Sequence, residues 1–122
     1  MVARALIVDD EESIRIMLAA IVRQQGFTVD TARDGEEAIA KLQGGNSYNV
    51  ILLDLMMPRV NGYDVLHHLR NTRPELLGRI IIATAVPERE IHREITEPVF
   101  KVHLKPFELP RLLADVRLCA AA

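Results

Sequence analysis

The sequence has a single cysteine, Cys119, so no disulfide can form within the chain of 122 residues. This cysteine and the four histidines show none of the spacings that ligate zinc. The sequence also lacks a large excess of charge of one sign, because it has 15 Lys and Arg residues and 17 Asp and Glu residues. The resulting net charge of −2 provides no general attraction to nucleic acid or to an anionic membrane. We therefore expect a reducing compartment and no direct contact with nucleic acid or membrane.

Long apolar stretches, repeats and linkers are absent as well. The longest apolar runs, near residues 50–53 and 80–83, are far shorter than the ~20 residues that span a bilayer. An acidic cluster follows shortly after the amino end, unlike the pattern of a signal peptide. No segment repeats, and no stretch rich in Pro, Gly or Ser divides the chain. We expect a single cytoplasmic domain over residues 1–122, without a DNA-binding output domain.

Five short apolar runs alternate with segments of helical spacing. The segments 14–22 and 109–116 show the clearest helical spacing, whereas residues 87–97 show the weakest and predict a short or irregular fourth helix. Alternating units of this kind predict an α/β fold in which helices cover both faces of a five-stranded parallel sheet, (βα)5 and doubly wound. The apolar runs predict strands at residues 5–8, 28–31, 50–53, 80–84 and 102–104.

Polar side chains follow the apolar runs where the strands should end. Asp9 and Asp10 follow the first run and Asp54 the third, while Thr84 closes the fourth and Lys105 follows the fifth. Ligands of open parallel sheets bind at the carboxyl ends of the strands, so we expect these side chains to converge. Three carboxylates with one ammonium carry excess negative charge, which a bound cation would offset. Oxygen ligands favour a hard cation such as Mg²⁺.

Each of these residues also has an ordinary structural interpretation. The acidic run 9–12 fits a helix start, Thr84 fits a strand, and Lys105 fits a solvated strand end. Asp54 fits less well, because a carboxylate directly after three apolar residues is poorly solvated without a partner. The joint pattern favours a site in which one carboxylate is a nucleophile toward a phosphoryl group, with Lys105 and Thr84 at the phosphoryl oxygens.

Taken together, these motifs resemble the receiver domain of bacterial response regulators in two-component signalling. The resemblance covers essentially the whole chain and implies a flavodoxin-like sheet with strand order 2-1-3-4-5. The matching motifs, in order, are Asp9-Asp10, Asp54 within Leu-Leu-Asp-Leu-Met-Met-Pro, Gly62, Thr84-Ala85 and Lys105-Pro106-Phe107.

The resemblance assigns roles around a magnesium ion. Asp54 would accept a phosphoryl group from the phosphohistidine of a sensor histidine kinase or a histidine phosphotransfer protein. Asp10, Asp54 and the backbone carbonyl of Met56 would ligate Mg²⁺ directly, and Asp9 would act through a metal-bound water. Beyond this self-directed phosphotransfer and autodephosphorylation, the resemblance implies no enzyme.

The resemblance also implies which residues contact the phosphoryl oxygens and how the protein associates with partners. Thr84 and Lys105 would contact these oxygens, and the bond between Lys105 and Pro106 would be cis, as it usually is in the family. The output partner is not named by any motif, and the protein would be a monomer or a weak homodimer.

The chain departs from the family pattern at three positions. Val102 stands where the family usually carries Tyr or Phe, which keeps open an interaction-only receiver that works without phosphorylation. Met56 and Val86 are apolar and cannot position a water for attack by hydrogen bonding, so we expect slow loss of the phosphoryl group.

The sequence argues against two other functions found on similar sheets, and it also predicts which polar residues lie at the surface. An aspartyl phosphatase normally has Asp-x-Asp, but Met56 replaces the second acid, and the acidic loop 9–12 would repel the phosphate of a flavin mononucleotide. The four histidines are expected at the surface, and residues 89–97 are expected to form a solvated helix face without chemistry.

Overall fold

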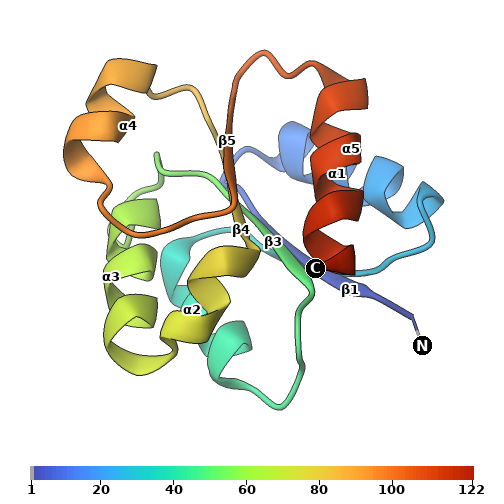
Figure 1. Cartoon of the computed structure of the whole chain (residues 1–122), viewed down its shortest axis with the longest axis horizontal. Helices are drawn as coiled ribbons and strands as arrows, with labels where there is room; N and C mark the ends of the chain where they lie inside the picture. Colours follow the sequence, from blue (N-terminus) through green and yellow to red (C-terminus); the bar gives the residue numbers. More distant parts are fainter. Residues whose placement is uncertain (1) are drawn as a thin grey trace.

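Five parallel strands form one sheet in the order β2-β1-β3-β4-β5, which confirms the predicted fold class (Figure 1). The computed structural model describes residues 2–122. The elements along the chain are β1 (Arg4–Val8), α1 (Glu12–Gln24), β2 (Thr28–Ala32), α2 (Gly35–Gln43), β3 (Val50–Leu53), α3 (Gly62–Thr72), the 3-10 helix η1 (Pro74–Arg79), β4 (Ile80–Thr84), α4 (Glu88–Glu94), β5 (Lys101–Leu104) and α5 (Leu109–Ala121).

Helices cover both faces of the sheet because successive strand residues point to opposite sides. In β1, Ala5 and Ile7 pack toward α1 and α5, while Leu6 and Val8 pack toward α2, α3 and α4. All residues of β3 and β4 are buried. The continuously apolar runs of the sequence therefore correspond to strands that are covered on both sides.

Local signals explain where several helices begin. The Asp34 side chain accepts a hydrogen bond from the Glu37 amide at the start of α2. A reciprocal pair of side-chain bonds between Asn61 and Asp64 forms a capping box at the start of α3. These caps fix the loops that leave β2 and β3 at the carboxyl edge of the sheet.

The structure adds detail that the sequence patterns did not give. The helix η1 between α3 and β4 was not predicted, and β5 begins at Lys101. The fourth helix has only seven residues, of which Ile91 alone is buried, so the expectation of a short α4 is confirmed. The Lys105–Pro106 peptide bond is cis, as the resemblance implied.

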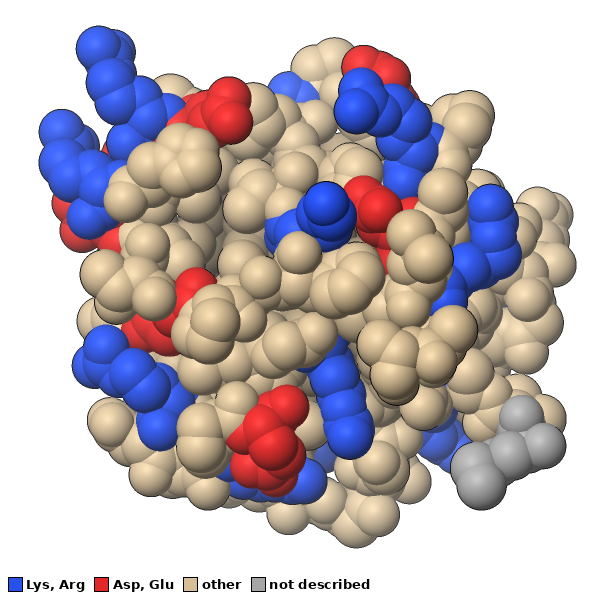
Figure 2. Space-filling model, in the orientation of Figure 1, with Lys and Arg blue, Asp and Glu red and all other residues tan. Residues whose placement is uncertain are grey.

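The surface in the orientation of Figure 1 carries basic and acidic side chains interspersed with one another (Figure 2). This distribution agrees with the nearly balanced charge of the sequence. Within residues 2–122, we find no helix that combines the length and the apolar character needed to cross a membrane.

Candidate functional site

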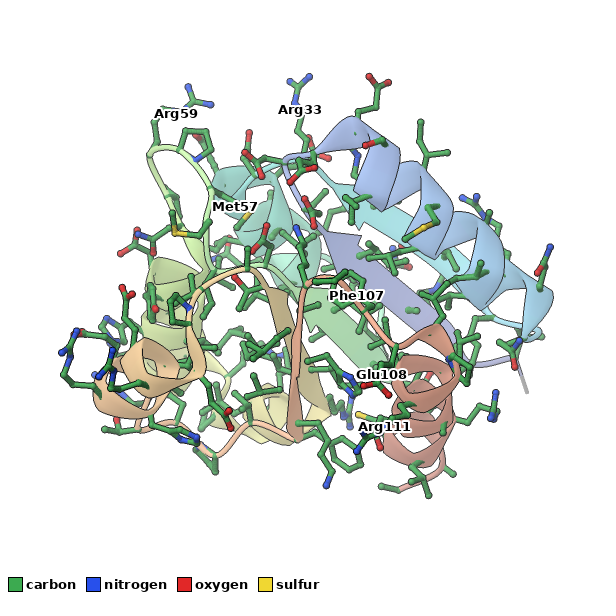
Figure 3. All side chains as sticks on the ribbon, turned by 90° about the horizontal axis from the view of Figure 1, so that it is seen from above. Arg33, Met57, Arg59, Phe107, Glu108 and Arg111 are labelled. Carbon is green, nitrogen blue, oxygen red and sulfur yellow. The ribbon has the colours of Figure 1, made fainter. Side chains whose placement is uncertain are left out.

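Strand register places the polar residues of the site at one edge of the sheet. Val8 of β1 pairs with Leu53 of β3, so the next residues, Asp9 and Asp54, leave the sheet at the same level. The backbone continues this order, because the Asp54 amide donates to the Val8 carbonyl at 3.0 Å. The loops around this edge carry Arg33 and Arg59, which project outward when the sheet is seen from above (Figure 3).

Three carboxylates meet at this edge. Asp9, Asp10 and Asp54 each offer an oxygen, and these oxygens lie within 4.8 Å of one another. Asp9 and Asp54 are 1% and 3% exposed, whereas Asp10 is exposed. Burial raises the pKa of the Asp9 carboxyl, although the bond from Lys105 lowers it, and the nearby charge of Asp54 adds to the rise.

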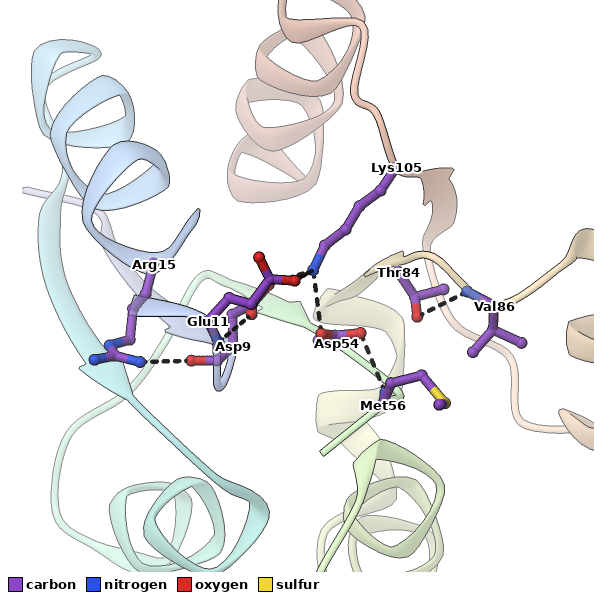
Figure 4. A network of polar contacts seen from close by, with 8 residues as sticks. All are labelled: Asp9, Glu11, Arg15, Asp54, Met56, Thr84, Val86 and Lys105. Atoms are coloured by element: carbon purple, nitrogen blue, oxygen red, sulfur yellow. Dashed lines mark hydrogen bonds and ion pairs between the residues drawn. The ribbon is translucent and has the colours of Figure 1, made fainter. Parts of the chain in front are cut away.

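Lys105 bridges two of these carboxylates (Figure 4). Its Nζ lies 2.9 Å from Asp9 Oδ2 and 3.2 Å from Asp54 Oδ2. Burial lowers the pKa of the ammonium, but the bond to Asp9 and the charge of Asp54 outweigh this effect and raise the pKa overall. The ammonium therefore stays charged at neutral pH and is aimed at the pair of buried acids.

Backbone groups orient the two buried carboxylates. The Glu11 amide donates to Asp9 Oδ1 at 2.9 Å, and the Met56 amide donates to Asp54 Oδ1 at 3.2 Å. A Cβ at Gly62 would lie only 2.3 Å from the Asp54 carbonyl oxygen, so the loop after β3 needs a glycine there. The second oxygen of each carboxylate faces Lys105.

Thr84 and Met56, the other two predicted site residues, differ from each other in burial and contacts. Thr84 is fully buried at the end of β4, and its hydroxyl accepts a hydrogen bond from the Val86 amide at 3.3 Å. Met56 is 61% exposed. Asp10, Asp54, Met56 and Lys105 all line a cavity of about 590 Å³ that opens beside the carboxylates.

Two contacts at the site were missed by sequence reasoning. Glu11, which the acidic run assigned to a helix start, places Oε1 3.8 Å from Lys105 Nζ. Arg15, one turn into α1, donates to the Asp9 carbonyl at 2.8 Å. The acidic run itself could have indicated Glu11, whereas no sequence signal distinguishes Arg15 from other helix-surface arginines.

Two surface expectations were wrong. His103 has only 14% of its side chain exposed, because its Nε2 lies 2.7 Å from Asp115 Oδ2 on α5. Glu97, at the end of the segment expected to be a solvated helix face, is 6% exposed and lies beyond the end of α4. In both cases a charged neighbour on another helix makes burial tolerable, and sequence spacing does not reveal such neighbours.

The donor set of the site fits a hard divalent cation. Three carboxylates and one ammonium leave a net negative charge at a partly buried position, which a divalent cation would compensate. Burial and the nearby charge of Asp54 raise the pKa of Asp9, which means that the ionised form of Asp9 is unfavourable in the absence of such an ion. The acidic cluster Asp9, Asp10 and Asp54 can therefore bind a metal ion.

The fold and this acidic edge define a class of protein: a doubly wound parallel sheet with a carboxylate cluster and a bridging lysine at its carboxyl edge. The family model of the response regulator receiver domain matches residues 5–117. The chain belongs to this family, the receiver domains of two-component response regulators. The complete set of acids with Lys105 favours the phosphoacceptor function of the family over an interaction-only receiver.

Curated relatives are response regulators that are longer than this chain. The response regulator MprA of Mycobacterium sp. (strain KMS) is 36% identical over 120 residues, which are 96% of this chain and 50% of MprA. The transcriptional regulatory protein CpxR of Klebsiella pneumoniae is 42% identical over 114 residues, 93% of this chain and 47% of CpxR. The transcriptional regulatory protein TcrA of Mycobacterium tuberculosis is matched over only 27% of its length. The chain thus spans about a quarter to a half of these relatives.

Solved structures of similar proteins cover nearly the whole chain. The chemotaxis response regulator CheY4 of Vibrio cholerae has a TM-score of 0.86 at 30% identity, covering 98% of this chain and 99% of that one. The response regulator TrrA of Thermotoga maritima, solved in complex with Mg²⁺-BeF, has a TM-score of 0.83 at 31% identity, covering 96% and 98%. These similarities bear out the receiver-domain fold.

Proposed function

We propose that Asp54 is the phosphoacceptor of a receiver domain that occupies residues 1–122. The observation that carries the proposal is the position of Lys105 Nζ, which lies 3.2 Å from Asp54 and 2.9 Å from Asp9 in a buried acidic cluster. An ammonium at this place can neutralise phosphoryl oxygens as well as carboxylate oxygens. The Asp54 carboxylate also lines an open cavity, through which a phosphodonor can reach it.

Mg²⁺ is the cation that we propose for the acidic cluster. Asp10, Asp54 and the Met56 carbonyl would ligate it directly, and Asp9 would act through a water. Support comes from the all-oxygen donor set and from the similar TrrA, which was solved with Mg²⁺-BeF. When bound, Mg²⁺ would shield the negative charge of the transferred phosphoryl group from the surrounding carboxylates.

The chemical step joins an Asp54 carboxylate oxygen to the phosphorus of a phosphohistidine. The new O–P bond forms while the P–N bond breaks, and the departing imidazole nitrogen keeps the electron pair. Lys105 neutralises charge on the phosphoryl oxygens, and the Thr84 hydroxyl donates a hydrogen bond to one of them. The Thr84 oxygen accepts a hydrogen bond from the Val86 amide, and its O–H can still donate because a hydroxyl has one donor and two acceptor lone pairs.

The partners follow from the family. Receiver domains of response regulators act with histidine kinases and output domains, so we propose that a sensor histidine kinase or a histidine phosphotransfer protein is the phosphodonor. The protein acts in the cytoplasm, as a monomer or weak homodimer, without direct contact to nucleic acid or membrane. Phosphorylation of Asp54 would switch a protein-interaction surface of this domain, and an unidentified output protein or domain would bind that surface.

The test is intact-mass measurement after incubation with acetyl phosphate and Mg²⁺. We expect the mass of one phosphoryl group to be gained, and we expect chelation of Mg²⁺ or the substitution Asp54→Asn to abolish the gain. Glu36→Gln is the matched control, because Glu36 is an exposed acid on α2 away from the cluster. Equal phosphorylation of Asp54→Asn would overturn the assignment of Asp54. Failure of wild type to gain mass would favour the interaction-only receiver.

A further inference from the structure

A buried carboxylate lies in the connection between α4 and β5, about which the proposed function says nothing. Only 1% of the Glu97 side chain is exposed, and its Oε2 lies 3.4 Å from Arg70 NH1 and 3.7 Å from His67 Nε2. Both partners belong to α3 and are about half exposed. Glu97 therefore ties the α4–β5 connection, residues 95–100, to α3 through charge attraction.

The hydrogen bonding of this carboxylate is incomplete. Oε1 accepts a hydrogen bond from the Thr96 amide at 3.3 Å, but no donor within residues 2–122 bonds to Oε2. Tyr63 carries the second buried side-chain oxygen without a partner in the described part of the chain. Tyr63, His67 and Arg70 are spaced i, i+4 and i+7 along α3, which places them on one face. Of the two buried oxygens without a partner, the Tyr63 hydroxyl therefore lies on this face of α3 and Glu97 Oε2 lies in the α4–β5 connection beside it.

Apolar contacts also hold the connection. Ile95 and Val99 pack against the core cluster on this side of the sheet, and the Phe100 amide donates to the Ile80 carbonyl at 2.8 Å. A buried carboxylate paired with the Arg70 guanidinium at this distance adds little beyond such packing, because desolvation offsets most of the attraction. Removing its cation, however, leaves an uncompensated buried charge, which is strongly unfavourable.

We infer that Arg70 and Glu97 form a latch, which keeps the α4–β5 connection on α3 and sets how often the connection separates from it. Arg70 is a positioning residue in this device: it holds the connection only because Glu97 is buried there. The connection leads directly into β5, so its separation alters the surface made by α4 and β5. That the latch tunes the output of phosphorylated Asp54 rests on the proposed function, whereas the latch itself does not.

Hydrogen exchange measured by NMR on the full chain tests the latch without any phosphodonor. The reporters are the hydrogen-bonded amides of Ile95, Val99 and Phe100. Arg70→Met should speed their exchange at least about tenfold, because it removes the guanidinium beside the buried Glu97 carboxylate and leaves only the His67 ring near it. Arg70→Met combined with Glu97→Met should return their exchange to within about threefold of wild type, because the apolar packing remains.

Matched controls separate the latch from general effects. Arg93→Met removes an exposed cation of α4, whose 3.6 Å partner Glu94 is also exposed, and it should leave the three amides unchanged. Exchange in β1 and β3 reports global stability and should not respond. If Arg70→Met does not fold, Arg70→Lys and the double variant carry the test: Arg70→Lys should stay within about threefold of wild type because the charge remains.

Any of three results would overturn the latch. The first is exchange in Arg70→Met equal to that in Arg93→Met, and the second is exchange in the double variant at least as fast as in Arg70→Met. Equal loss of protection in Arg70→Lys would overturn it as well. Adding Mg²⁺ and beryllofluoride then tests the link to Asp54. We expect faster exchange of the same three amides in wild type and a smaller change in the double variant. An unchanged Asp54 loop under these conditions would refute the proposed function and leave the latch intact.

Discussion

Lys105→Met tests whether the ammonium compensates the two buried acids. Met retains most of the length and the apolar volume of the lysine but removes its charge. In the structure, this charge lies 2.9 Å from an oxygen of Asp9 and 3.2 Å from an oxygen of Asp54. The three side chains are 14%, 2% and 4% exposed, so water replaces little of the lost interaction.

The expected loss is large because the substitution strands two negative charges together. Removing one partner of a buried ion pair costs about 3–5 kcal/mol, and the partial exposure of Lys105 places the expectation near the lower end, at about 3 kcal/mol. For a domain of this size that corresponds to a fall of roughly 12 °C in Tm. Urea unfolding followed by circular dichroism, without divalent cations at pH 7, measures the change in the free energy of unfolding.

Two further variants make this measurement decisive. Lys101→Met removes an exposed lysine from β5 and should change the free energy of unfolding by less than about 0.5 kcal/mol. Adding Asp9→Asn to Lys105→Met should recover at least half of the loss, because it removes one of the uncompensated charges. A loss in Lys105→Met no larger than in Lys101→Met would refute the reasoning.

Three other predictions concern the same edge of the sheet. Asp9→Asn should stabilise the metal-free protein at pH 7. Because the pKa of Asp9 is raised in the folded state, the stability that protonated Asp9 contributes is complete below pH 3.8 and is lost as pH rises through the folded pKa. Urea unfolding from pH 4 to 8 should therefore show a free energy of unfolding that depends less on pH in the variant than in wild type. Phosphorylated wild type should lose its phosphoryl group over minutes or longer and Met56→Gln at least about tenfold faster, because an amide can orient a water; a wild-type half-life of seconds by intact mass would contradict this. Gly62→Ala should lower thermal stability by about 2 kcal/mol because its Cβ would meet the Asp54 carbonyl, whereas Gly45→Ala, with nothing within 4 Å, should be nearly neutral in the same melts.

The strands and the site were readable from the sequence because their signals are local. The run before Asp54 is apolar at every residue, and this pattern predicts a strand buried on both faces. The polar residue after each run then marks the carboxyl edge. The short α4 was also foreseeable, since Ile91 is its single buried residue and the segment offers no continuous apolar face.

The remaining features depend on neighbours that are distant in the sequence. His103 is covered because Asp115 of α5 approaches it. Glu97 reads as one more charge of a solvated segment until its position against Arg70 is known. Whether a charged side chain is buried depends on the partner supplied by another element, and no spacing along the chain encodes that partner.

The sequence by itself therefore determined the order of strands and helices, the acids and lysine of the site, and the family to which they belong. Hydrophobic period and the position of polar residues after apolar runs carry that information. Only the tertiary structure decided how the charges are paired: Lys105 between two buried acids, and Arg70 against Glu97. The physical reason is that Coulomb attraction and desolvation depend on distances in space and on burial, which chain packing sets.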